Sequence, residues 1–309
     1  MRKVIGIGET LLDIIFKDNK PVEAVPGGST FNAIVSLGRV GADALFVTET
    51  GDDHVGALVR SFLSSNNVCT DYVLERKGWK SPVSLAFLDS DNNANYTFYR
   101  DPNADPVDMP LPDINPDDIV LLGSFYAVSP ATRAQVIALL ERARDCGAII
   151  YYDVNFRPSH RGDVMKVTPN LIENLEFADI VRGSRDDFEV LYKKDSAERV
   201  YRAETSFYCP RLVYTDGPRP VTVFSDGGFR KEYAMPETPT VSTIGAGDNF
   251  NAGLICAMLR YDIRRADIER GLTETEWSKL VESATAFSAD CCAGIYNYVS
   301  KEFGASHSL

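Results

Sequence analysis

Short apolar runs alternate with longer amphipathic stretches along most of the chain. The runs are rich in Val, Ile and Leu, which is typical of buried strands, and the stretches after them have the spacing of helices. The expected strands cover residues 4–8, 44–48, 119–122, 148–153, 179–182 and 212–215. Strands that alternate with helices predict an α/β fold: a doubly wound, mostly parallel sheet with flanking helices.

Capping residues predict where several helices begin. A glycine pair opens the first helix, and Ser29 or Thr30 is its expected cap. Proline suits a first helical turn, so another helix is expected to start at Ser129-Pro130. The last helix is expected to start at Thr273, which opens a capping box.

Residues 83–100 interrupt this rhythm. Alternating runs at 83–88 and 96–99 flank a polar turn, which predicts a β-hairpin outside the main sheet. The segment 12–24 contains another short apolar stretch and is expected to pair with the hairpin. Residues 1–309 are therefore expected to form a single domain, in which about 12–24 and 83–100 form a small β unit outside the main sheet.

Composition limits the partners. The 309 residues carry a net charge of −12, from 32 basic and 44 acidic residues, which argues against nucleic acid and anionic membranes as partners. The chain has no run long enough to span a membrane, and its N-terminal apolar run is too short for a signal peptide. Six cysteines without a CxxC pair predict free thiols, and three histidines argue against a His-rich metal site. We expect a cytoplasmic protein.

The segment 242–253 carries the most chemical information. Its glycines lead from extended chain into an apolar helix, and the free N–H groups of a helix N-terminus form an anion site. Asp248 stands where that helix begins. A carboxylate at an anion site suits a base that deprotonates a hydroxyl attacking a phosphate. The alternative is an ordinary helix cap, and the segment alone leaves both readings open.

Further polar residues follow the expected strands, at the edge where doubly wound sheets bind ligands. They are Glu9 and Asp13, residues 153–157, Gly183-Ser184 and residues 215–217. A dinucleotide fingerprint is excluded, because Leu11 stands where Gly6-x-Gly8 would need a third glycine. The sequence contains neither a Walker motif nor a Gly-x-Ser-x-Gly elbow.

Taken together, these residues resemble the ribokinase-like (PfkB) family of carbohydrate kinases. Residues 243–253 resemble the C-terminal signature of the family, and residues 26–32 resemble its N-terminal signature. The Asp-x-Asn-x-Arg at 153–157 and the Thr-x-Gly at 215–217 fit the family in order and spacing. The Phe-Tyr-Arg at 98–100 looks most like fructokinases and ketosugar-acid kinases.

The resemblance implies an ATP- and Mg²⁺-dependent kinase that phosphorylates a primary hydroxyl of a free sugar. Asp248 would be the base, and the amides of Gly245, Ala246 and Gly247 would hold the transferring phosphoryl group. The implied substrate-binding residues are Asp13, Gly27, Gly28, Asn32, Arg100, Asn155 and Arg157. The implied nucleotide-binding residues are Ser184, Thr215 and Gly217. The hairpin would act as a lid over the sugar that excludes water, and it could also pair across a homodimer.

Some implied roles have plain structural alternatives. Asn32 could bond a helix terminus, Asp13 could be a solvated loop acid, and Arg100 could be a solvent-facing charge at a strand end. We expect the substrate to be fructose, phosphorylated at its 6-hydroxyl. The alternatives are 2-keto-3-deoxygluconate, a nucleoside, or a non-catalytic sugar sensor.

The sequence departs from the family pattern at two places. Ser242 stands where the family has an Asp that helps frame a monovalent-cation site, so the resemblance leaves potassium activation open. Residues 184–187 read Ser-Arg-Asp-Asp where the family has Asn-x-x-Glu. Asp187 remains a candidate to orient Mg²⁺ through water, because a hard cation accepts any carboxylate oxygen.

Overall fold

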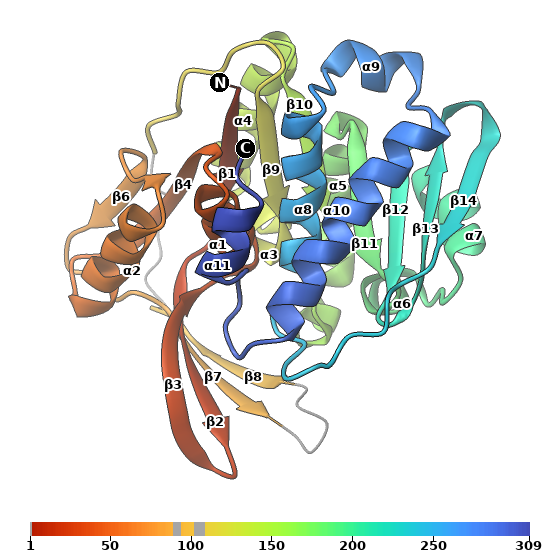
Figure 1. Cartoon of the computed structure of the whole chain (residues 1–309). Coiled ribbons are helices and arrows are strands. Elements are labelled where there is room, and N and C mark those ends of the chain that lie inside the picture. Colours follow the sequence, from red (N-terminus) through yellow and green to blue (C-terminus); the bar gives the residue numbers. More distant parts are fainter. Residues whose placement is uncertain (1, 89–93, 102–108) are drawn as a thin grey trace.

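A large mixed sheet runs through the molecule (Figure 1). The computed structural model describes residues 2–88, 94–101 and 109–309. The strands of this sheet are β1 (Lys3–Ile7), β4 (Asp43–Gly51), β5 (Val68–Cys69), β6 (Val73–Arg76), β9 (Ile119–Gly123), β10 (Ile149–Asp153), β11 (Ile180–Ser184), β12 (Leu212–Asp216), β13 (Arg219–Ser225) and β14 (Phe229–Tyr233). Their order is β14-β13-β12-β11-β10-β9-β1-β4-β5, with β6 also on β4. Among the described strands of this large sheet, the pairs β12–β13 and β13–β14 are antiparallel and the others are parallel.

Helices cover both faces of this sheet, which confirms the doubly wound class. They are α1 (Ser29–Arg39), α2 (His54–Ser65), α3 (Ser124–Val128), α4 (Arg133–Asp145), α5 (Val164–Phe177), α6 (Arg185–Tyr192), α7 (Ala197–Val200), α8 (Ala246–Arg260), α9 (Arg265–Arg270), α10 (Glu274–Cys292) and α11 (Lys301–Ser306). Short 3₁₀ turns occupy Pro158–Asp163 and Asp226–Gly228, and a π turn occupies Tyr201–Thr205.

Neighbouring residues of the strands point to opposite faces and enter two separate cores. Val4 packs into a core that also contains residues of α1, α2, α8 and α10. Its neighbour Ile5 packs into a second core with residues of α4, α5 and α6. The strands are therefore apolar on both faces, which is the pattern seen in the sequence.

A second, four-stranded sheet projects from one end of the main sheet (Figure 1). We call it the small sheet; it consists of β2 (Leu11–Lys17), β3 (Lys20–Gly27), β7 (Val83–Leu88) and β8 (Ala94–Tyr99). β7 and β8 form the expected antiparallel hairpin, and β2 pairs with β3 antiparallel and with β7 in parallel. The expected pairing of the segment 12–24 with the hairpin is confirmed, and the paired region reaches Leu11 and Gly27.

Two predicted helix starts are wrong. Ser129-Pro130 starts no helix: α3 ends just before it, and α4 starts after Thr132. Ser129 is extended, with ψ of 132°, because the residue before a proline avoids the helical region. Neither Ser29 nor Thr30 caps α1, since the capping position is Gly28, with φ of 132°.

The C-terminal prediction was partly right. Thr273 caps α10 with the expected capping box, in which its hydroxyl accepts from the Glu276 N–H. This helix is not the last one, because α11 follows it and Ser300 caps α11. No helix of the described residues is long and apolar enough to cross a membrane.

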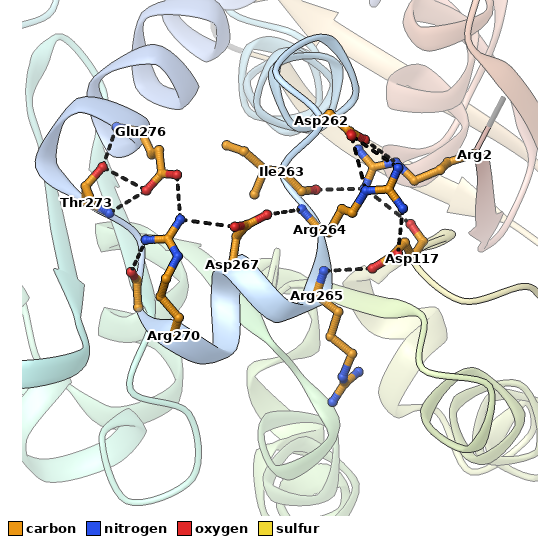
Figure 2. Close-up of polar contacts among 11 residues, drawn as sticks. Arg2, Asp117, Asp262, Ile263, Arg264, Arg265, Asp267, Arg270, Thr273 and Glu276 are labelled. Carbon is orange, nitrogen blue, oxygen red and sulfur yellow. Dashed lines mark hydrogen bonds and ion pairs between the residues drawn. The ribbon is translucent and has the colours of Figure 1, made fainter.

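Polar contacts fix the connection between α8 and α10 (Figure 2). This connection follows the C-terminal end of α8, whereas Asp248 lies in the first turn of that helix. Arg2 donates at 2.7 Å to the carbonyls of Met258 and Ile263, which joins the start of β1 to the end of α8. Arg270 donates at 2.7 Å to Glu276 and at 3.1 Å to Asp267, which joins α9 to the first turn of α10. These contacts stabilise the C-terminal end of α8 and touch none of the predicted site residues.

Candidate active site

Two cavities meet at the N-terminus of α8. The inner cavity lies between the small sheet and the carboxyl ends of the central strands. The outer cavity lies beside the ends of β11 and β12. Asp248, Gly245, Asn155 and Arg157 line both cavities. A group in one cavity can therefore meet a group in the other at Asp248.

Asp248 lies in the first turn of α8 and is 5% exposed. Its two carboxylate oxygens accept hydrogen bonds of 2.8 Å from the Ser29 hydroxyl and the Asn32 side-chain amide. Burial raises the pKa of Asp248, while Arg157 and these two hydrogen bonds oppose the rise. An oriented carboxylate of raised pKa suits proton abstraction. Its oxygens bond side chains of α1, which differs from the simple cap considered above.

The glycines before Asp248 are required by their surroundings. Gly245 has φ of 77°, and a Cβ there would lie 2.4 Å from the Asn297 carbonyl oxygen. A Cβ on Gly247 would lie 2.9 Å from the Arg182 guanidinium. Ala246 and Gly247 line the outer cavity with Gly245. The N-terminal amides of α8 are thus next to the space where an anion can sit.

Arg182 is a candidate functional residue that sequence reasoning missed. It lies on β11, lines the outer cavity, and is 7% exposed. Its guanidinium donates to Asp153 at 3.0 Å and to the Thr215 hydroxyl at 2.7 Å. The second oxygen of Asp153 accepts from Asn251 at 2.8 Å. A fixed positive charge therefore lies directly behind Gly247. An arginine within the apolar run Ile180-Val181-Arg182 was the available signal, because unpaired charges are rarely buried.

Asp13 lies on β2 of the small sheet and lines the inner cavity. It is buried, unlike a solvated loop acid, and it accepts hydrogen bonds from the Ser84 hydroxyl and, at 3.0 Å, from the Asn297 amide. Burial raises its pKa to about 6. Gly28 and Asn32 line the same cavity, whereas Gly27 is not among the described lining residues. A Cβ on Gly27 would meet the Asp13 carboxylate at 2.3 Å, so Gly27 makes room for that group.

Basic side chains also line the inner cavity. Arg100 forms an ion pair of 2.6 Å with Glu9, so it is not a free charge at the strand end. The Arg157 guanidinium has no hydrogen-bond or ion-pair partner within residues 2–88, 94–101 and 109–309. His160, which the sequence did not single out for this site, stacks on Phe125 with ring centroids 3.8 Å apart. The cavity thus combines acids with cations and suits a polar, hydroxylated ligand.

Two of the three predicted nucleotide-binding residues line the outer cavity, and the third does not. Ser184 and Gly217 line the outer cavity together with Asp187. Thr215 is not among its described lining residues, and its hydroxyl supports Arg182 instead. The Asp187 carboxylate accepts hydrogen bonds from the Phe156 N–H at 2.8 Å and from the Ser184 N–H at 2.7 Å. The Ser184 hydroxyl donates a further hydrogen bond to it at 2.7 Å. Asp187 is therefore a capping residue whose oxygens already have partners.

Within the described residues, no group of three or more His, Cys, Asp or Glu side chains could hold a metal ion. Mg²⁺ commonly needs only one or two carboxylates and is otherwise held by phosphate oxygens and water. The carboxylate of Asp187 lines the outer cavity, and because its oxygens already accept three hydrogen bonds, it would reach such an ion only through water. Ser242, where the family has Asp, is buried, and its hydroxyl accepts from the Ile244 N–H at 3.2 Å.

Comparisons with known proteins show the family and the fold. A family model described as "pfkB family carbohydrate kinase" matches residues 1–292. The fructokinase of Vibrio alginolyticus is 23% identical over 264 residues, which are 84% of this chain and 85% of that protein. A double mutant of the fructokinase from Vibrio cholerae O395, solved with fructose, ADP and potassium ion, has a TM-score of 0.86 at 18% identity and covers 100% of this chain and 99% of that one. The aminoimidazole riboside kinase of Salmonella enterica, solved with aminoimidazole riboside and an ATP analog, has a TM-score of 0.85 at 20% identity, with 99% of both chains covered.

Proposed function

The chain belongs to the PfkB family of carbohydrate kinases and is a sugar kinase, and we propose that it transfers a phosphoryl group from ATP to a primary hydroxyl of free fructose, giving fructose 6-phosphate. The observation that carries the proposal is the position of Asp248 on the wall shared by both cavities. The inner cavity would hold the sugar and the outer cavity would hold ATP. The reacting hydroxyl and the transferring group would then meet at one carboxylate.

In this mechanism Asp248 accepts the proton of the attacking hydroxyl. Ser29 and Asn32 orient its oxygens, and its raised pKa improves it as a base. The amides of Gly245, Ala246 and Gly247 would stabilise charge on the transferring group, with the Arg182 charge behind them. ATP supplies the phosphoryl group, and Mg²⁺ held on its phosphates, with Asp187 reaching it through water, would neutralise their charge.

In the inner cavity, Asp13, Gly28 and Asn32 would bind the sugar hydroxyls, with Asn155 and Arg157 next to the transferring group. Gly27 would contribute indirectly, by leaving room for the Asp13 carboxylate. In the outer cavity, Ser184 and Gly217 would contact the nucleotide, and Thr215 would act through Arg182. The small sheet would serve as a lid that excludes water from the reaction.

Fructose is favoured by the name of the relative from Vibrio alginolyticus, a fructokinase that is 23% identical to this chain. One observation favours 2-keto-3-deoxygluconate as a second candidate: Arg100 and Arg157 line the same cavity, and a substrate carboxylate needs such cations. Against it, Glu9 already neutralises Arg100.

A substrate panel with coupled ADP detection separates the candidates. Fructose, 2-keto-3-deoxygluconate, ribose and aminoimidazole riboside are compared at matched concentrations. A higher kcat/KM for fructose than for the other three supports the proposal. Good turnover of the sugar acid or the nucleoside without turnover of fructose refutes the choice of sugar, and sugar binding without product would indicate a sensor.

Asp248→Asn tests the mechanism. The variant keeps the size of the side chain but removes the base, so kcat should fall by about 10²–10⁴-fold. Sugar affinity, measured by calorimetry, should stay within a few-fold. Retention of more than about a tenth of the wild-type kcat contradicts the assignment of the base.

The proposal also covers assembly and location. Val22 and Tyr99 are 55% and 58% exposed on the small sheet, so an outer face of the lid is available for homodimer contacts. Light scattering of wild type and of Val22→Lys tests the dimer, since a buried lysine there would weaken it.

We place the enzyme in the cytoplasm because its six cysteines are free, and cell fractionation tests this.

A further inference from the structure

Asn297 touches both halves of the active site. It lies between α10 and α11 and is 1% exposed. Its side-chain amide donates at 3.0 Å to Asp13, on the small sheet. Its backbone carbonyl lies so close to Gly245 that any Cβ there would be 2.4 Å from the carbonyl oxygen. One residue therefore connects the carboxylate of the inner cavity to the glycine that starts α8.

Other bonds fix this segment against the start of α8. The side-chain amide of Asn249 donates at 2.8 Å to the Gly245 carbonyl and at 2.8 Å to the Asn297 carbonyl. The Cys291 thiol lies 3.3 Å from the Ile244 carbonyl oxygen. A movement of Asn297 would thus be transmitted to the backbone from Ile244 to Gly245, which presents its amides to the outer cavity.

We propose that Asn297 is a positioning residue that couples the Asp13 carboxylate to the glycine loop before Asp248. The inference rests on the proposed sugar kinase activity and adds a residue outside both family signatures. Through its side chain, Asn297 orients Asp13 and favours its ionised form. Through its backbone, it holds the glycine loop at the distance from Asp13 that phosphoryl transfer requires, because positioning errors of an ångström can cost orders of magnitude in rate.

Ser84 provides a matched comparison. Its hydroxyl also donates to Asp13, but Ser84 lies on β7 of the small sheet and is not bonded to the glycine loop. Ser84 and Asn297 both lower the pKa of Asp13, whereas burial and the charges of Asp248 and Glu9 raise it. The charge of Asp13 in turn raises the pKa of Tyr96 and of Tyr298. Removing either donor should raise the Asp13 pKa above its value of about 6, but only removal of Asn297 should disturb the glycine loop.

The experiment measures kcat and sugar KM from pH 5 to 8 for wild type, Ser84→Ala and Asn297→Ala, with the best sugar of the substrate panel. Both variants should move the acid limb of kcat/KM upward by about one pH unit, because a hydrogen bond to a charged group is lost. Only Asn297→Ala should also lower kcat at saturating sugar, by about tenfold or more. Asn174→Ala removes a buried carboxamide on α5 that bonds Ala127 and Arg133, and it should change neither the acid limb nor kcat.

An unchanged acid limb in Asn297→Ala overturns the role at Asp13. A kcat equal to that of Ser84→Ala overturns the coupling. If the alanine variant fails to fold, Asn297→Ser replaces it, because serine keeps a hydrogen-bond donor in a smaller side chain. This variant should lower kcat and shift the acid limb of kcat/KM by less than Asn297→Ala. If neither kcat nor the acid limb changes, the inference is refuted. A wild type without turnover of any sugar would instead refute the proposed function, so the two failures are distinguishable.

Discussion

The Arg182–Asp153 ion pair allows stability and catalysis to be separated by mutation. The two side chains are 8% and 2% exposed, and their atoms are 3.0 Å apart. Arg182→Met leaves the Asp153 carboxylate buried without its cation. Breaking a buried pair on one side costs about 3–5 kcal/mol. At an effective dielectric constant of about 20, the attraction between the charges is itself about 5 kcal/mol. We therefore expect the free energy of unfolding to fall by about 4 kcal/mol.

The double variant Arg182→Met, Asp153→Asn removes both charges. An asparagine at 153 can still accept the hydrogen bond that Asn251 donates, and replacing a buried pair by neutral groups is often nearly neutral. Most of the lost stability should return. The kcat should not return, because the charge behind Gly247 is still missing; we expect both variants to remain about 10²-fold below wild type.

Urea unfolding followed by circular dichroism gives the stability, and coupled ADP detection at saturating substrates gives kcat. Arg133→Met is the control: it removes a half-buried arginine that pairs with Glu173 at 2.6 Å on α5, outside both cavities. It should lose stability and keep kcat. Recovery of kcat to within about threefold of wild type in the double variant would refute a role for the Arg182 charge at the glycine loop.

Three further predictions follow from the same geometry. Gly245→Ala should lower kcat by more than about tenfold in steady-state assays, because its φ of 77° disfavours a side chain and its Cβ would meet the Asn297 carbonyl; wild-type kcat would contradict this. Burial raises the pKa of Asp13 from 3.8 to about 6, so the folded protein binds this proton more tightly than the unfolded chain, and the free energy of unfolding should fall as pH rises through that window. Asp13→Asn should remove that part of the slope in urea titrations, and an unchanged slope would show that Asp13 does not cause it. Arg2→Met loses two hydrogen bonds to carbonyls at the end of α8 and should cost about 2 kcal/mol of stability with unchanged kcat, as thermal unfolding and the kinase assay can check.

The sequence was sufficient for the fold class and for the main elements, because alternating apolar runs and capping residues are local signals. It was insufficient for the start of α4, where Pro130 suited a first turn but instead holds Ser129 extended. It was also insufficient for the cap of α1, because Gly28 needed no side chain to take that position. Local patterns therefore predicted which elements exist better than where they begin.

The site divides in the same way. Asp248 and its glycines carry a motif, so the sequence could predict them as site residues, and it also predicted Asp13; all of them lie at the two cavities or beside them. Arg182 and Asn297 carry no motif, and their proximity to the glycine loop arises from the packing of β11 and of the segment after α10. Such contacts join residues far apart in the chain, and no local pattern encodes them.

The candidate site is built from two separate structural elements, the small sheet and the helix α8. Asp13 belongs to the small sheet, whereas Asp248 belongs to α8 and packs on α1. Substitutions on β2, β3, β7 and β8 that leave Asp13 and Ser84 unchanged can therefore reshape one wall of the inner cavity without contacting residues 245–248. Under the proposed function, this arrangement would let sugar preference change in an evolving lineage while phosphoryl transfer is preserved. For an engineer, the small sheet is accordingly the first place to randomise in a search for new acceptors.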